Sequence, residues 1–241
     1  MIILPPMPPE QTAAWHAVLD IHDRLDDGWA LIGGQLVHLH CAERGQSETR
    51  PTNDADTVID VRAQPNMLHR FTATLVDLGF EAHGISAEGL QHRWVRGPAS
   101  IDVLLPEGAG ERANARLGIT GSPTLPAEGG TQALRGTVTV AVTVEGRRGF
   151  VRRPNLVGAL VTKAAAHGRT GGDRRRHRYD LVILAGLVTA TDFAAETLSR
   201  SDRRHLRSIV AAVERDRELL VQMPEALRAI ERLGLAARLN A

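Results

Sequence analysis

Residues 29–61 read WALIGGQLVHLHCAERGQSETRPTNDADTVIDV, and this stretch decides the expected fold. It predicts a short apolar strand, a tight turn at Gly33 and Gly34, a helix that starts at the turn, a polar loop and a β-branched strand. These elements are expected over residues 29–32, 35–42, 43–53 and 54–61, with the turn between the first two.

The character of the sequence changes near residue 152. Helical and strand patterns alternate before it, whereas the apolar spacing after it is helical to the end. We therefore expect an α+β fold, with a mixed sheet flanked by helices over residues 1–152 and a C-terminal helical bundle over residues 153–241. Further helices are expected over 9–26, 65–78, 155–167, 177–188, 192–199, 202–221 and 224–235. Further strands are expected over 91–96, 100–105, 137–144 and 150–151, with a loop over 106–130.

Composition and charge exclude several classes of protein. The net charge is only +1, so it does not by itself indicate a strongly basic surface. Cys41 is the only cysteine, which excludes an intramolecular disulfide and a zinc site built from several cysteines. No apolar run reaches the roughly 18 residues that a membrane helix needs. We expect a cytoplasmic protein with no membrane contact.

Three aspartates are the candidate metal ligands. Asp54 and Asp56 are two apart on an expected strand, so their carboxylates point to the same face. Asp102 lies on a second expected strand, and the three converge if the strands are neighbours. Carboxylates held this close repel one another unless a cation lies between them, and Mg²⁺ or Mn²⁺ binds oxygen ligands of this kind. Although the Asp-x-Asp spacing is also common in turns, here it favours two-metal phosphoryl transfer, with Asp102 accepting the hydroxyl proton.

The glycine turn supports that interpretation. A Gly-Gly turn between a strand and a helix lets backbone N–H groups approach phosphate oxygens. A plain tight turn is the alternative. Because the turn precedes the Asp-x-Asp strand, the order favours a nucleoside triphosphate site.

The run from residue 31 to residue 60 resembles the opening motif of the DNA polymerase beta nucleotidyltransferase superfamily, so the expected fold is nucleotidyltransferase-like. The R-x-T-x-D-x-D pattern that begins at Arg50 and Thr52 resembles the AbiEii/AbiGii branch more closely. That branch supplies the toxins of type IV toxin–antitoxin systems. The resemblance covers roughly residues 29–188 and implies that Gly33, Gly34, Arg50 and Thr52 bind the nucleotide.

A second motif lies at residues 160–184, LVTKAAAHGRTGGDRRRHRYDLVIL. It resembles the K…R…D-L-x-x-L arrangement of the same branch, with Lys163, Arg169 and Asp180 at its polar positions. Lys163 is the only lysine in a chain of 29 Lys and Arg residues, which suggests a specific need for an ammonium group there. Lys163 and Asp180 both fall on expected apolar helix faces. Either they pair with each other, or Lys163 contacts the triphosphate while Asp180 orients it or another basic group.

Two basic clusters are candidate contacts for a triphosphate or an RNA backbone, with a solvated surface as the alternative. Their members are Arg174, Arg175, Arg176, His177 and Arg178 in the first, and Arg147, Arg148, Arg152 and Arg153 in the second.

The resemblance implies a Mg²⁺-dependent toxin that moves a nucleoside monophosphate from an NTP to an RNA hydroxyl, with the tRNA 3′ end as the expected acceptor and a cognate antitoxin as partner. Two alternatives stay open. One is the same chemistry on a small molecule such as an aminoglycoside, whose positive charge suits an acidic cleft better than a basic one. The other is a nucleotide-binding module without catalysis.

Overall fold

The computed structural model describes residues 1–46, 50–168, 173–194 and 196–239. Its elements in chain order are β1 (Ile2–Ile3), α1 (Pro9–Arg24), β2 (Trp29–Ile32), α2 (Gly33–Glu43), β3 (Asp54–Ile59), α3 (Met67–Asp77), β4 (Glu81–Ala82), β5 (Arg93–Arg96), β6 (Ala99–Pro106), α4 (Glu111–Asn114), β7 (Pro126–Ala127), α5 (Gly130–Arg135), β8 (Thr137–Val144), β9 (Arg147–Pro154), α6 (Leu156–His167), α7 (Arg174–Gly186), α8 (Arg200–Glu214), α9 (Arg217–Gln222) and α10 (Ala226–Ala236).

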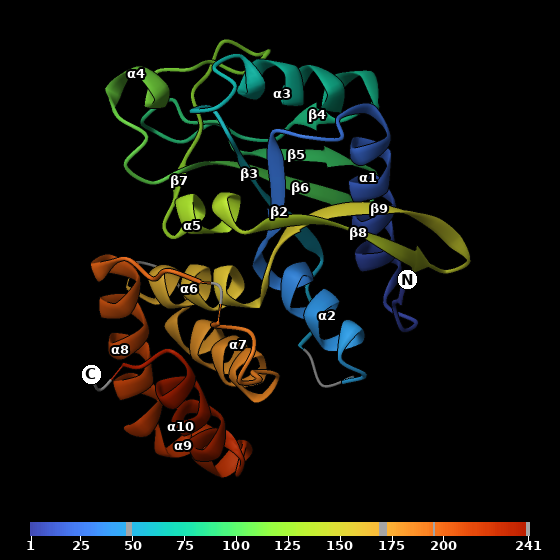
Figure 1. The fold of residues 1–241 in the computed structure, drawn as a ribbon. Coiled ribbons are helices and arrows are strands. Elements are labelled where there is room, and N and C mark those ends of the chain that lie inside the picture. The colour runs from blue at the N-terminus through green and yellow to red at the C-terminus, as the bar shows by residue number, and fades with distance from the viewer. Residues whose placement is uncertain (47–49, 169–172, 195, 240–241) are drawn as a thin grey trace.

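The strands form two sheets in the α/β half of the molecule (Figure 1). The larger sheet has the order β2-β3-β6-β5-β4, and β7 pairs with β6. Strands β3 and β6 are parallel neighbours, whereas β2 pairs antiparallel with β3 and β5 pairs antiparallel with β6. The smaller sheet has the order β1-β8-β9. The fold is therefore the expected mixed sheet flanked by helices.

The two faces of the larger sheet differ in character because side chains alternate along each strand. Ala55 and Ile59 of β3 and Ile101 and Val103 of β6 are buried in one core with helices α1 and α3. Asp54 and Asp56 of β3 and Asp102 of β6 alternate with these residues and therefore point away from that core. Burial of one face thus fixes which face carries the polar site.

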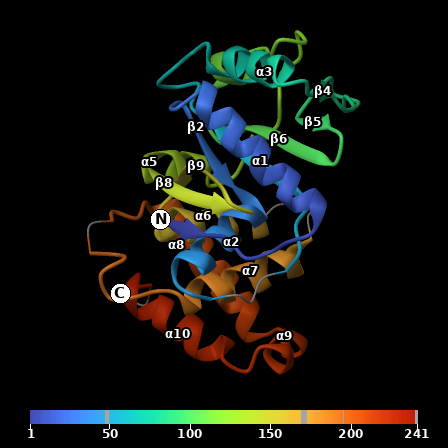
Figure 2. The same ribbon diagram turned by 90° about the vertical axis from the view of Figure 1, so that its right-hand side faces the viewer.

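The helices α6 to α10 gather at the end of the molecule opposite α3 (Figures 1 and 2). Their core includes Leu36, Val37 and Cys41 of α2 as well as the apolar residues of the C-terminal helices. Helix α2 therefore starts at the glycine turn of the α/β half and packs into the helical half. It connects the two parts of the chain through buried contacts.

The expected helix over 192–199 is wrong for the described residues of that segment, which form turns up to Ala194 and then an extended stretch. Asp192 accepts hydrogen bonds from the backbone N–H and the hydroxyl of Thr189, which folds a turn there. Ser199 is the N-cap of α8, in a capping box with Asp202, so a helix cannot run through it.

Other boundaries also differ from expectation. The expected helix over 202–221 is two helices, because Asp216 caps α9 by accepting from the N–H of Leu219. Helix α7 begins at Arg174 rather than at 177, since Asp173 caps it. The return strand β9 covers Arg147–Pro154 rather than two residues, and the expected loop over 106–130 contains α4 and β7. Strand β1 and helix α5 were not expected.

Within the described part of the chain, none of the helices has both the length and the apolar character needed to span a bilayer.

Candidate active site

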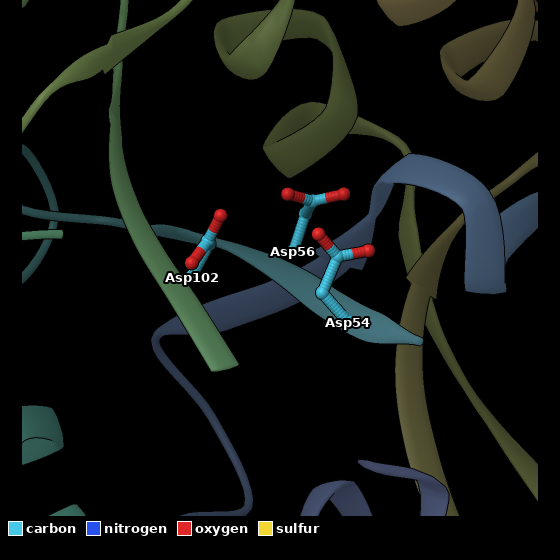
Figure 3. Close-up of side chains that lie close together, drawn as sticks. All are labelled: Asp54, Asp56 and Asp102. Carbon is cyan, nitrogen blue, oxygen red and sulfur yellow. The ribbon is translucent and has the colours of Figure 1, made fainter. Parts of the chain in front are cut away.

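The three candidate aspartates lie together on β3 and β6. The parallel register places Asp56 opposite Asp102 and Asp54 opposite Ser100. One carboxylate oxygen from each aspartate lies within 4.8 Å of the others, and all three side chains point to the same side of the sheet (Figure 3). The structure thus brings these residues together as the strand pattern implied, while their role as metal ligands stays a prediction.

Asp56 shows that the cluster fits a cation. Burial, together with the negative charges of Asp54 and Asp102, raises the pKa of Asp56 to about 7. Such crowding of carboxylates is unfavourable without a positive charge between them. Hard divalent ions bind carboxylate oxygens of this kind. Asp54, Asp56 and Asp102 are therefore the residues that would hold Mg²⁺ or Mn²⁺.

The glycine turn packs directly against this cluster. Gly33 has a φ of 75°, which favours glycine, and a Cβ at this position would collide with the Asp56 carboxylate. A Cβ at Gly34 would lie 2.6 Å from Oγ1 of Thr52. Thr52 donates from that hydroxyl to Asp54, at 3.0 Å. The backbone at the start of α2 therefore lies directly against Asp56 and Thr52. This close approach is possible because neither Gly33 nor Gly34 has a side chain.

Asp180 forms ion pairs with two basic side chains of the site, Lys163 and Arg50. Lys163 Nζ lies 2.7 Å from Asp180 Oδ2, and the Arg50 guanidinium contacts both Asp180 oxygens at 2.9 Å. Burial alone would raise the pKa of Asp180, but Lys163 and Arg50 outweigh it, so the pKa lies below its usual value. Asp180 is only 1% exposed and does not line the cleft, whereas Lys163 and Arg50 do. Asp180 therefore positions both basic side chains, and of the two alternatives for Lys163 and Asp180 the ion pair is present. Arg169 lies outside the described residues.

A cleft lies between the aspartates and the basic side chains Lys163 and Arg50, and its open space, solvent included, is about 820 Å³. Its lining combines the glycine turn, the polar loop before β3, two of the aspartates, the β7 segment and the facing sides of α6 and α7. The residues are Ile32, Gly33, Gly34, Arg50, Thr52, Asp54, Asp56, Leu104, Leu125, Pro126, Ala127, Glu128, Thr162, Lys163, Ala166, Arg176 and His177.

His177 contributes a neutral ring to this cleft. Burial, and then the charges of Lys163 and Arg176, lower the pKa of His177 to about 4. Its Nδ1 is buried and has no hydrogen-bond partner among the residues that the structure describes.

A second groove of about 750 Å³ lies on the other side of Asp54. Arg50, Thr52, Asp54 and Arg176 belong to both openings. The remaining lining residues of the groove are Pro51, Asn53, Arg93, Pro98 and Ser100. Among the described residues, its charged side chains are three arginines and one aspartate, and two of the arginines, Arg50 and Arg93, form ion pairs with Asp180 and Asp102.

Arg93 enters the acidic cluster itself. It lies directly opposite Asp102 in the antiparallel β5–β6 pair, donates to both Asp102 oxygens at 2.8 and 2.7 Å, and reaches Asp54 at 3.5 Å. Sequence reasoning did not single out Arg93, Arg176 or Glu128 individually. For Arg93 a signal was present, because a hairpin turning at Gly97 and Pro98 places residue 93 opposite residue 102.

The second basic cluster serves the fold rather than the cleft. Arg147 pairs with Asp20 at 2.8 Å, Arg152 donates to the backbone oxygen of Trp29, and Arg153 is buried against Glu43. None of these residues lines the cleft or the adjoining groove.

Comparison with known proteins places the fold. No protein-family model matches the chain, and no curated protein matches it either. Among solved structures, it is similar to an antigenic nucleotidyltransferase-like protein from Paracoccidioides brasiliensis, with a TM-score of 0.51, 16% identity and 95% of each chain covered. A second similar structure is the antibiotic-resistance factor ANT(2'')-Ia, with a TM-score of 0.47, 16% identity, and coverage of 86% of this chain and 97% of that one. The first likeness establishes a nucleotidyltransferase-like fold.

Proposed function

We propose that this protein is a divalent-metal-dependent nucleotidyltransferase that moves a nucleoside monophosphate from an NTP to a hydroxyl of RNA. The observation that carries the proposal is the convergence of Asp54, Asp56 and Asp102 at a cleft whose opposite wall holds Lys163 and Arg50. Carboxylates for a metal ion on one side and fixed cations on the other suit a triphosphate between them.

The donor nucleotide occupies the cleft beside the glycine turn in this proposal. Lys163 and Arg50, held by Asp180, bind phosphate oxygens, and the backbone at Gly33 and Gly34 is open for close approach of a phosphate. His177 supplies a neutral hydrogen-bonding group to the same cleft. Divalent ions, when bound, neutralise the triphosphate and lower the pKa of the attacking hydroxyl.

The reaction forms one bond and breaks one. The acceptor oxygen bonds to the α-phosphorus, the bond from that phosphorus to the bridging oxygen breaks, and pyrophosphate leaves with the electron pair. The hydroxyl proton passes to a carboxylate of the cluster, for which Asp102 is the candidate because it contacts Arg93, a lining residue of the second groove.

The charge of the second groove favours a polyanionic acceptor. Arg50, Arg93 and Arg176 line it, and Asp54 is the one acidic residue among its described lining. Phosphates of an RNA strand are stabilised by such side chains. A cationic aminoglycoside would meet like charge there, so the small-molecule acceptor is the second candidate. The tRNA 3′ end, a toxic outcome and a cognate antitoxin belong to the proposal through the AbiEii/AbiGii resemblance.

The test is a labelling assay. The purified protein is incubated with Mg²⁺ and each α-labelled NTP in turn, with total tRNA, with other RNA and with an aminoglycoside such as kanamycin. Label in RNA with at least one NTP supports the proposal. Label in the aminoglycoside alone would show that the acceptor is a small molecule and not RNA, while the nucleotidyl transfer itself would be supported. Mg²⁺-dependent NTP binding with no transfer to any acceptor favours the non-catalytic module.

A further inference from the structure

The guanidinium of Arg93 occupies space among the carboxylates that a second divalent ion needs. Arg93 donates one hydrogen bond to each oxygen of Asp102, and its Nη2 also lies 3.5 Å from Asp54 Oδ2. No hydrogen bond or ion pair joins Arg93 to the Asp56 carboxylate among the described residues. The arginine therefore neutralises one side of the acidic cluster and leaves the other side to the crowded Asp54 and Asp56.

A guanidinium and a divalent ion compete for Asp102. Two cations beside one carboxylate repel each other, and each Asp102 oxygen that accepts a hydrogen bond from Arg93 keeps one lone pair for a metal ion. Asp54 and Asp56 can hold a first ion without moving Arg93 far, because Arg93 makes only a long contact with Asp54. A second ion that includes Asp102 among its ligands requires Arg93 to turn away.

The Arg93 side chain can turn toward the second groove, which is the acceptor groove of the proposed function. Its side chain is 39% exposed, and it lines the groove together with Arg50 and Arg176. An arginine that leaves Asp102 loses a bidentate ion pair, so another anion must replace the carboxylate. A phosphate of an RNA acceptor in that groove supplies such an anion.

We propose that Arg93 blocks the second-metal position in the resting protein and releases Asp102 when an anionic acceptor enters the groove. This rests on the proposed function. The acceptor and the second ion then raise each other's affinity, because each favours the state in which Arg93 has left the cluster. Both metal positions are then filled, and nucleotidyl transfer can occur, only when an acceptor is bound.

The experiment measures Mn²⁺ binding to the full-length protein by calorimetry, without NTP. The variants are Arg93→Gln, which keeps much of the side-chain volume, and Arg93→Ala. The matched control is Arg96→Ala, since Arg96 lies on the same strand and its ion pair, to Asp20 at 2.9 Å, is remote from the cluster. Far-UV circular dichroism verifies that each variant is folded.

We expect one stronger and one weaker Mn²⁺ site in the wild type. Both Arg93 variants should strengthen the weaker site by about tenfold or more, as the loss of a competing charge implies, and Arg96→Ala should leave it unchanged. An RNA oligonucleotide that lacks a 3′ hydroxyl should strengthen the weaker site in the wild type but have a much smaller effect in the Arg93 variants.

Other results overturn the inference in distinguishable ways. Equal affinities in the wild type and the Arg93 variants, or a weaker second site in the variants, show that Arg93 does not compete with the ion. That outcome leaves the proposed function standing. If neither the wild type nor any variant binds Mn²⁺, the inference and the proposed function both fail.

Discussion

Gly33 is the backbone position on which the geometry of the cluster depends most directly. Its positive φ and its contact with Asp56 are separate constraints, and they can be tested separately. Gly33→Ala introduces both the strained backbone and a collision with the carboxylate. Gly89→Ala is the matched control, because Gly89 has a φ of 78° and open space around its Cβ position.

We expect each glycine variant to lose about 1–2 kcal/mol of stability from the left-handed backbone. Only Gly33→Ala should also lose Mn²⁺ binding and nucleotidyl transfer, since only its methyl group displaces Asp56. Denaturant unfolding and the labelling assay measure the two effects. Equal activity in the two variants would show that close approach at Gly33 is not required.

Asp180 links folding stability to the site through its two buried ion pairs. Asp180→Asn leaves Lys163 and Arg50 without their counter-charge, and we expect a loss of about 3–5 kcal/mol at pH 7. The pKa of Asp180 lies below its ordinary value of 3.8, so its contribution is fully present above pH 3.8 and disappears as the pH falls through the lowered pKa.

The stability difference between the wild type and Asp180→Asn should therefore be constant from pH 7 to pH 5 and shrink in stronger acid. Urea unfolding across that range measures it. Asp77→Asn, at an exposed position on α3, should cost less than about 0.5 kcal/mol. A difference that grows on acidification would contradict this account of Asp180.

Helix α7 presents neighbouring arginines to different surroundings. Arg176 lines both the donor cleft and the acceptor groove, whereas Arg175 pairs with Glu218 of α9 at 2.7 Å. Arg176→Ala should weaken RNA binding and lower the slope of log affinity against log salt by about one phosphate contact. Arg175→Ala should leave both quantities unchanged. Binding titrations at several salt concentrations compare them, and equal losses would exclude a specific role for Arg176.

The elements differ in how far the sequence could predict them. The strand pattern around Asp54 predicted its shared face with Asp56, because alternation is a local property. The neighbouring position of β6 had to be assumed, since strand order is not encoded in local spacing. The pairing of Arg50 with Asp180 joins residues 130 positions apart, and only the fold reveals it. The helix boundaries at Ser199 and Asp216 were missed because capping hydrogen bonds outweighed the apolar pattern.

The two halves of the chain share buried contacts through α2. The three tryptophans all lie in the core of the α/β half, while Leu36 of α2 is fully buried in the helical core. The sequence placed a boundary near residue 152, and this division stays a prediction. If the halves unfold together, the site between them is held rigidly from both sides.

We expect tryptophan fluorescence and far-UV circular dichroism to report the same denaturation midpoint. Leu36→Ala should lower both midpoints together. It should reduce the free energy of unfolding by about 2–5 kcal/mol. A circular dichroism transition that precedes any change in fluorescence would show that residues 153–241 unfold as an independent domain.

In the proposed function, the aspartate cluster carries metal-dependent nucleotidyl transfer. The most direct measurement is the rate of label transfer from an α-labelled NTP to RNA, with Mg²⁺, by the wild type, Asp56→Asn and Asp60→Asn. Asp60 follows β3 and only caps a turn at Ala63, so it controls for the loss of a carboxylate beside this strand. We predict transfer by the wild type and by Asp60→Asn, and a loss of at least about a hundredfold in Asp56→Asn. Undiminished transfer by Asp56→Asn would contradict the account.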